Sequence, residues 1–219
     1  MSYTGQVSVG GEADVRELAE ATIAKLAVGP GSNNVYLLRC RRTGEALLID
    51  AADEADRVVE FAALGGEVAG AVLTTHRHPD HWQALAPLVA RTGARTLAGA
   101  HDAEGIPVPT DRALQHGDTV QVGQLELAVT HLRGHTPGSI ALYYRDPDGH
   151  GHLFTGDSLF PGGVGRTWQE GDFEQLLGDV SERLFDVYAD DTWFYPGHGD
   201  DSTLGAERPH LAEWRERGW

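Results

Sequence analysis

The segment from Thr75 to His81 places three histidines and one aspartate within seven consecutive residues. It directly follows an apolar stretch that we expect to form a β-strand. His76 and His78 are two positions apart, a spacing that directs both side chains to the same side of an extended chain. Imidazole and carboxylate groups are ligands that zinc and related divalent ions accept in proteins. The segment therefore predicts half of a metal site, with the remaining ligands further along the chain.

Length and charge limit the classes of protein to which this chain can belong. Its 219 residues, 41% of them hydrophobic, are enough to bury a full core, and we expect a single domain over residues 1–219. The formal net charge of −16 argues against a nucleic-acid partner, because such binding depends on clustered basic side chains.

The N-terminal residues and the cysteine count predict a compartment. Residues 1–11 contain neither a basic n-region nor an apolar h-region, and no apolar run approaches the roughly 20 residues needed to span a bilayer. Cys40 is the only cysteine, which excludes an intrachain disulfide and a thiolate metal cluster. We therefore expect no membrane partner and a cytoplasmic location, and we leave the oligomeric state open.

The hydrophobic pattern predicts short strands with helices between some of them. The predicted strands are residues 22–28, 34–40, 46–50, 68–74, 125–131, 139–144, 152–155 and 192–195. The predicted helices are residues 53–63, 81–92 and 172–185, each with an apolar stripe typical of a helix that packs on a core.

Three further candidate ligands lie next to predicted strand ends. His135 precedes strand 139–144, Asp157 follows strand 152–155, and His198 follows strand 192–195. Loops at one edge of a sheet framework can converge on a point, so we expect these residues to meet the Thr75–His81 segment.

Together these residues make seven ligands, which suffice for two ions because zinc usually takes three or four protein ligands. We assign three histidines to the first ion: His76, His78 and His135. The second ion takes Asp80, His81 and His198, and Asp157 bridges the two. The expected cofactor is a pair of divalent ions, with zinc preferred and iron or manganese as alternatives.

These motifs together resemble those of the metallo-β-lactamase superfamily of hydrolases. The T-H-x-H-x-D-H run, the G-H-T-P-G-S segment (134–139), the G-D-S-L-F segment (156–160) and the P-G-H-G segment (196–199) occur in that family's order and at similar separations. The resemblance covers about residues 15–205. It implies an α/β fold, the four-layer αβ/βα sandwich, with two mixed sheets packed face to face, helices outside and the site at one edge.

Within the superfamily, the chain is most similar to the glyoxalase II-like branch, because G-D-S-L-F is followed by G-V-G-R (163–166). That branch hydrolyses thioesters, and the resemblance implies that Arg166 and Trp168 contact the thiol carrier. Only 21 residues (219 minus 198) follow His198, whereas glyoxalase II has a further helical domain that binds glutathione. Asp200 also replaces an aromatic residue of that enzyme. We therefore expect a member without the C-terminal helical domain, acting on a thioester of another small thiol or of a coenzyme.

The expected reaction is hydrolysis of a small-molecule thioester by a hydroxide that bridges the two ions, since a metal lowers the pKa of bound water to about 7. The first ion would polarise the acyl carbonyl and the second would receive the departing thiolate. Asp80 would also orient the hydroxide, a catalytic role inferred from its position and from the resemblance.

Two alternative functions remain open. A persulfide dioxygenase resembles this branch but uses a single iron and effectively one half of the ligand set, and the intact second half argues against it. A metal-binding regulatory protein built on a hydrolase fold would keep the ligands without the activity.

Several other polar residues are assigned lesser roles. His131 is a candidate for orienting His135. Asp50 is also a candidate for a carboxylate that supports a ligand, although an ordinary strand terminus is favoured. Trp82 is expected to pack beside the metal segment. The remaining histidines lack motif context and are expected to be structural or at the surface: His101, His116, His150, His152 and His210.

Overall fold

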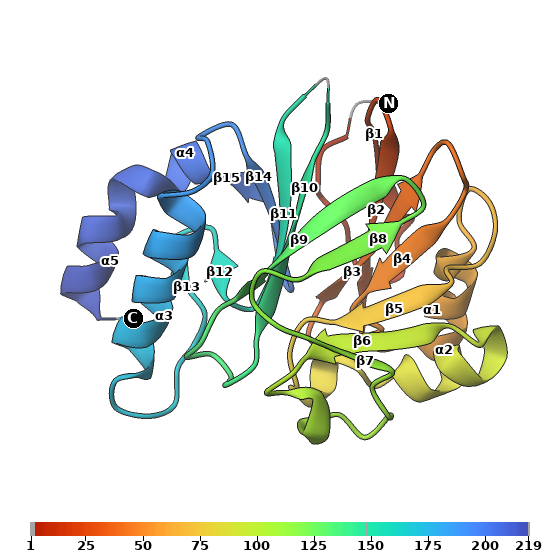
Figure 1. The fold of residues 1–219 in the computed structure, drawn as a ribbon, viewed down its shortest axis with the longest axis horizontal. Helices are drawn as coiled ribbons and strands as arrows, with labels where there is room; N and C mark the ends of the chain where they lie inside the picture. The colour runs from red at the N-terminus through yellow and green to blue at the C-terminus, as the bar shows by residue number, and fades with distance from the viewer. Residues whose placement is uncertain (1–2, 148, 219) are drawn as a thin grey trace.

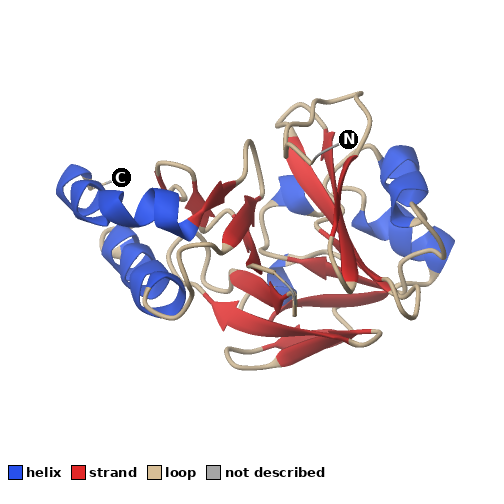
Figure 2. Cartoon of the chain, turned by 90° about the horizontal axis from the view of Figure 1, so that it is seen from above, coloured by secondary structure: helices blue, strands red, loops and turns tan. Residues whose placement is uncertain are grey.

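The computed structural model describes residues 3–147 and 149–218, so four residues of the predicted domain, 1–2, 148 and 219, lie outside the described part. Two β-sheets pack against each other, and helices cover the outer face of each (Figures 1 and 2). This is the four-layer αβ/βα sandwich that the sequence motifs imply.

The first sheet has seven strands in the order of the chain, β1 to β7. They are β1 (Asp14–Glu17), β2 (Ala21–Val28), β3 (Asn33–Cys40), β4 (Ala46–Ile49), β5 (Ala71–Thr74), β6 (Arg95–Gly99) and β7 (Arg112–Leu114). Strands β1 to β4 pair antiparallel, and β4 to β7 pair parallel. Parallel neighbours need crossover connections. Helix α1 (Ala55–Ala62) connects β4 to β5, α2 (Leu85–Thr92) connects β5 to β6, and a segment with a 3-10 turn (Ala103–Gly105) connects β6 to β7.

The second sheet has six strands in the order β15-β14-β11-β10-β9-β8. They are β8 (Thr119–Val122), β9 (Leu125–His131), β10 (Ile140–Arg145), β11 (Gly151–Gly156), β14 (Trp193–Pro196) and β15 (Ser202–Thr203). Strands β11 and β14 run parallel, so their carboxyl ends reach the same edge. A small ribbon of β12 (Leu159–Phe160) and β13 (Gly163–Val164) follows β11.

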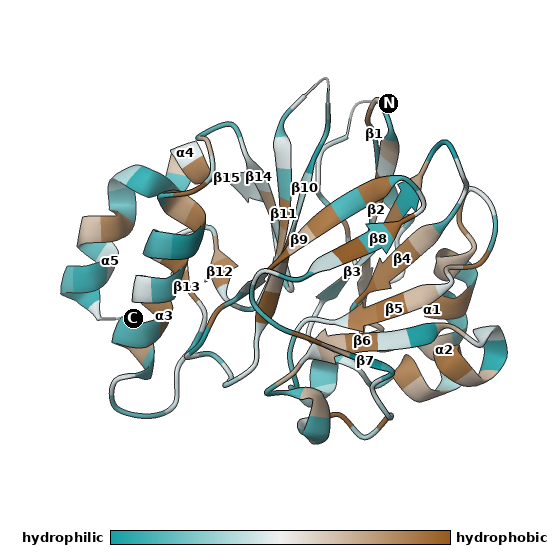
Figure 3. Ribbon diagram, in the orientation of Figure 1, coloured by the Kyte–Doolittle hydropathy of each residue, from teal (hydrophilic) through white to brown (hydrophobic). Residues whose placement is uncertain are grey.

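Three apolar layers hold the sandwich together. Successive side chains of β3 alternate between two of these layers. Tyr36 and Leu38 face the core between the sheets, whereas Val35 and Leu37 face α1 and α2. Both faces of the first sheet are therefore apolar (Figure 3). The third layer lies between the second sheet and the C-terminal helices, which are α3 (Asp172–Val180) with a π-helical turn (Ser181–Phe185), α4 (Leu204–Glu207) with a 3-10 turn (Arg208–His210), and α5 (Leu211–Arg217).

All eight predicted strands are present, with ends that differ by up to three residues, and Cys40 is buried in β3 as expected. The predicted helix 81–92 is shorter: a 3-10 turn (Pro79–His81) is followed by α2 from Leu85. The predicted helix 172–185 changes to π-helical winding at Ser181. Among the described residues, no helix has the length and apolar composition needed to span a membrane.

Candidate metal centre

The seven predicted ligands come together at one edge of the sandwich, where strands of both sheets end. The Thr75–His81 segment follows β5, Asp157 follows β11, and His198 follows β14. His135 lies in the loop between β9 and β10. A backbone hydrogen bond from Ile140 to the carbonyl of Thr75 joins the two sheets at this edge.

Three imidazoles form the first half of the cluster. The ring nitrogens of His76, His78 and His135 lie within 4.8 Å of one another. His135 Nε2 is 2.9 Å from His78 Nδ1 and 3.3 Å from His76 Nε2. Three nitrogens that converge on one point form the geometry in which histidines hold a metal ion.

Asp80, His81 and His198 form the second half, again with ligand atoms within 4.8 Å of one another. His198 Nε2 lies 3.3 Å from Asp80 Oδ2. Asp157 stands between the halves: its carboxylate is 3.5 Å from the Nε2 atoms of both His81 and His198 and 3.7 Å from His135 Nε2.

When these rings are neutral, hydrogen bonds on their far side leave the inward nitrogens without a proton. Nδ1–H donates to Asp50 in His81, to the carbonyl of Arg166 in His135 and to the carbonyl of Gly31 in His198, at 2.9, 2.7 and 2.9 Å. When one ring nitrogen of a neutral imidazole donates, the other carries a lone pair. The Nε2 lone pairs of these three rings therefore face the centre of the cluster, as metal binding requires.

A cation fits among these atoms. His81 Nε2 and Asp157 Oδ1 are buried and have no hydrogen-bond partner among the described residues, and such unsatisfied atoms are costly. Gly197 makes the close approach of the His198 loop possible, because a Cβ there would collide with Asp157 Oδ1. Buried nitrogen and oxygen atoms that lack a hydrogen-bond partner and face one point can serve as ligands of a divalent ion.

The pKa shifts favour the protonation states that bind metal at most of these groups. Burial lowers the pKa of His76 well below its ordinary value, and the neighbouring imidazoles add to this. Burial alone would raise the pKa of Asp157, but the imidazoles of His81 and His198 hold it well below its usual range. Burial opposes a charge on His81, yet Asp157 and Asp50 raise its pKa well above the ordinary value. A proton on His81 thus occupies the place that a metal cation would take.

Asp50 corrects the sequence-based interpretation, which favoured an ordinary strand terminus. Its carboxylate accepts hydrogen bonds from the Thr75 backbone N–H at 2.7 Å, the Thr75 hydroxyl at 2.8 Å and His81 Nδ1–H at 2.9 Å. It is 2% exposed, so these bonds are its main stabilisation. Asp50 therefore fixes both the start of the histidine segment and the orientation of His81.

Asn33 was not predicted and also contacts the cluster. Its side-chain amide donates to Asp80 Oδ2 at 2.9 Å and lies 3.4 Å from His198 Nε2. The only sequence signal was the polar Asn33-Asn34 pair at the start of a predicted apolar strand.

The predicted role of His131 as an orienting partner of His135 is not what its contacts show. His131 Nε2–H donates to the carbonyl of Pro137 at 2.7 Å, and its ring stacks on His101 at 5.2 Å between centroids. The carbonyl of Arg166 serves His135 instead. Trp82 is half-buried on the α1 and α2 side of the core, and its Nε1–H donates to the carbonyl of Arg77 at 2.9 Å, so it lies beside the metal segment as expected.

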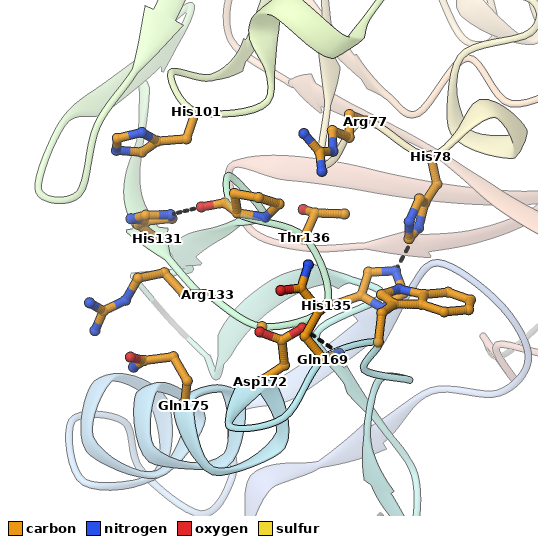
Figure 4. A pocket seen from close by; sticks show the side chains of 13 residues that line it. Arg77, His78, His101, His131, Arg133, His135, Thr136, Gln169, Asp172 and Gln175 are labelled. Atoms are coloured by element: carbon orange, nitrogen blue, oxygen red, sulfur yellow. Dashed lines mark hydrogen bonds between the residues drawn. The ribbon is translucent and has the colours of Figure 1, made fainter.

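Arg166 and Trp168 lie beside the first half of the cluster. The Trp168 ring is 6.0 Å from the His78 ring between centroids, and the Arg166 guanidinium lies over the Trp168 ring at 4.5 Å. Trp168 is 57% exposed, so its ring is available to a ligand. A cavity of about 470 Å³ opens next to His78, His135 and Trp168 (Figure 4).

Comparison with known proteins agrees with this arrangement. Residues 28–198 match the model of a family described as the metallo-beta-lactamase superfamily. The chain belongs to the metallo-beta-lactamase superfamily. The matched segment ends at His198 and contains all seven residues of the cluster.

Curated relatives of this superfamily member are named hydroxyacylglutathione hydrolase. The protein from Polaromonas sp. is 38% identical over 164 residues, 74% of this chain and 60% of that protein. The protein from Fuscovulum blasticum is 39% identical over 63% of this chain and 52% of its own length. The chain thus spans slightly more than half the length of these relatives.

Solved metallo-beta-lactamase superfamily structures share its fold. ETHE1 from Myxococcus xanthus has a TM-score of 0.76 and 32% identity, covering 89% of this chain and 84% of its own. A protein crystallised in a di-iron-bound form, TTHA1623, has a TM-score of 0.71 and 33% identity, covering 84% and 96%.

Proposed function

We propose that this chain is a binuclear metallo-hydrolase that cleaves an acyl thioester of a small thiol. The observation that carries the proposal is the pair of ligand groups joined by Asp157, with lone pairs directed to the centre of each. The relatives named hydroxyacylglutathione hydrolase support the thioester as the bond that is cut.

The residues divide the work of holding two divalent ions. Three histidines would hold the first ion (His76, His78, His135), three side chains the second (Asp80, His81, His198), and Asp157 both. When bound, such ions supply Lewis acidity and activate water near neutral pH. We propose zinc as the resident metal. Iron is the main alternative, given the di-iron form of one structural neighbour.

The protein side chains would position the reactants. Asp80 is held by Asn33 through Oδ2, and we propose that it orients the attacking hydroxide. Asp50 keeps the His81 ring fixed. Arg166 and Trp168 would contact the thiol carrier. The Trp168 ring lies beside the His78 ring, and the Arg166 guanidinium lies over the Trp168 ring.

Metal analysis of the purified protein followed by a substrate panel tests the function. The panel contains thioesters of glutathione, coenzyme A and other small thiols, with the matching oxygen esters as controls. We expect two metal ions per chain and thioester hydrolysis that stops when the metal is chelated and returns when it is restored.

Two outcomes would replace the proposal. A single iron per chain with oxygen uptake on a thiol persulfide would favour the dioxygenase alternative. A fully metallated protein that hydrolyses none of the panel would favour a regulatory metal-binding protein.

A further inference from the structure

The cavity beside the first ligand group has a wall that the metal chemistry does not use. Its lining includes two arginines from separate loops: Arg77 from the segment after β5, and Arg133 from the loop between β9 and β10 (Figure 4). The metal ligands His78 and His135 also line this cavity. A substrate whose scissile bond lies at the metal cluster can therefore extend a group into this cavity.

A buried carboxylate lies behind each guanidinium group; that of Arg133 is held by hydrogen bonds, whereas that of Arg77 is near its carboxylate without a hydrogen bond. Arg133 forms a two-pronged ion pair with Asp179, with distances of 2.8 and 2.7 Å, and its Nη1 makes no hydrogen bond to a described residue. Arg77 Nε lies 3.8 Å from Asp102. Asp179 and Asp102 are 3% and 0% exposed, whereas the two arginine side chains are 43% and 45% exposed. The exposed guanidinium groups thus offer N–H donors to the cavity, and the carboxylates lie behind them.

The side chains that line the cavity include two arginines and one aspartate, and the carboxylates of Asp179 and Asp102 lie behind the arginines. The sequence has 33 acidic and 17 basic residues, yet Asp172 is the only acidic residue among the described residues that line this cavity. Asp172 already accepts a hydrogen bond from the backbone N–H of Gln169 at 3.0 Å. A guanidinium group that is held in place, as that of Arg133 is by Asp179, binds a carboxylate well because little side-chain freedom is lost on binding.

From these contacts we infer that the cavity receives a carboxylate carried by the substrate, with Arg77 and Arg133 as specificity-determining residues. The inference rests on the proposed thioesterase function and narrows its substrate class to anionic thioesters. The carboxylate can belong to the acyl group or to the thiol, since either part can lie on this side of the scissile bond.

Two matched pairs of thioesters distinguish these sources. On the acyl side, a succinyl thioester is compared with the uncharged 4-oxopentanoyl thioester of the same neutral thiol. On the thiol side, the acetyl thioester of 3-mercaptopropionate is compared with that of 3-mercaptopropionamide. We expect the charged member of one pair to have a kcat/KM roughly tenfold to a hundredfold higher, the effect of one charge-assisted hydrogen bond.

Variants assign the preference to the two arginines. Arg77→Gln and Arg133→Gln should move the charged-to-neutral ratio of kcat/KM towards one, mainly through KM. Arg215→Gln, an exposed change of the same charge on α5, should leave the ratio as it is. Because Arg133→Gln leaves Asp179 without its bidentate partner, Arg133→Lys serves as a second variant that keeps the charge but loses the fork. Circular dichroism and metal content confirm that each variant is folded and loaded.

The possible outcomes separate this inference from the proposed function. Hydrolysis of both members of each pair at equal rates would overturn the anionic subsite and leave the thioesterase function standing. A preference that survives both arginine changes would also overturn it. If no thioester is hydrolysed, the proposed thioesterase function is wrong, and the carboxylate subsite that rests on it is wrong as well.

Discussion

Asp50 lies 25 residues before Thr75 in the sequence, yet its carboxylate contacts both that residue and His81. Its left-handed backbone, with φ of 60°, turns the chain directly after β4 and directs the carboxylate towards the histidine segment. Asp50, which is not itself a ligand, thus determines which ring nitrogen of His81 faces the ligand cluster.

The bridging position of Asp157 leads to a prediction about metal content. Asp157→Ala should lose both ions, because its carboxylate lies between the two ligand groups. His198→Ala should lose mainly one ion, because His198 belongs to the second group alone. Elemental analysis of the two purified variants measures this, with His116→Ala as a histidine control outside the cluster. Equal losses in the two variants would contradict a bridging role.

His152 predicts a pH dependence of stability that is separate from the metal ligands. Burial and the nearby Arg16 lower its pKa to about 4 from 6.5. Between these values the unfolded chain binds a proton that the folded chain does not bind. The stabilisation is therefore complete above about pH 6.5 and is lost as pH falls towards 4, by about 3 kcal/mol.

Urea unfolding of the chelated protein across this pH range measures the effect. His152→Gln should show a shallower loss of unfolding free energy between pH 6.5 and 4 than the parent protein. Identical slopes would show that His152 does not titrate in this way.

At the scale of elements, the loop that carries His198 is held by strands from the other sheet. The Asn34 side chain donates to the carbonyls of Pro196 and Gly199, at 3.0 and 2.9 Å. Lys25 in β2 donates to the Gly199 carbonyl at 2.8 Å and to Asp201 at 2.7 Å. Lys25 is fully buried, so this ion pair has little contact with water.

Breaking this pair should affect both stability and the second ligand group. Lys25→Met leaves Asp201 buried without its cation, which we expect to cost about 3–5 kcal/mol of unfolding free energy and to weaken binding of one ion. The double variant Lys25→Met/Asp201→Leu removes both charges and should recover much of the loss. Denaturant unfolding and metal titration measure both effects. A double variant as unstable as the single one would contradict the ion-pair explanation.

The elements that sequence could predict are those whose pattern is local. Strands such as β3 and β9 carry enough apolar residues to be found, and the histidine segment places four ligands in one run. Strand β7 has three residues and β12 has two, so each depends on a neighbouring strand for its formation. Helix α5 was missed because its one fully buried residue, Trp214, packs on Phe185 from a different helix.

The role of Asp50 was only the less favoured of two interpretations, and that of Asn33 was not predicted, for a related reason. Each acts on a ligand through tertiary approach, and neither belongs to a run of ligand residues. The ligands themselves are marked by residue type and by strand ends, whereas their orienting partners are ordinary polar residues until the chain is folded.

At the scale of the molecule, the ligand cluster joins the two sheets. The first sheet contributes the Thr75–His81 segment, and the second contributes His135, Asp157 and His198. Bound metal should therefore stabilise the association of both halves. Chelation is expected to lower the melting temperature, and free metal at about 100 times its Kd should restore roughly 2.7 kcal/mol. Differential scanning calorimetry measures this, and a melting temperature that is unchanged by chelation would contradict it.

Lys25 is the only lysine in the sequence, and its amine is enclosed between the two sheets. Its Nζ donates to Gly5, Gly199 and Asp201, so an amine-reactive reagent can reach it only when one of these segments separates from β2. The rate at which Lys25 is acylated in the native protein, measured by mass spectrometry, therefore reports how often the structure opens at this site. Because opening around Gly199 would also release the His198 loop, acylation of Lys25 should be slower when metal is bound.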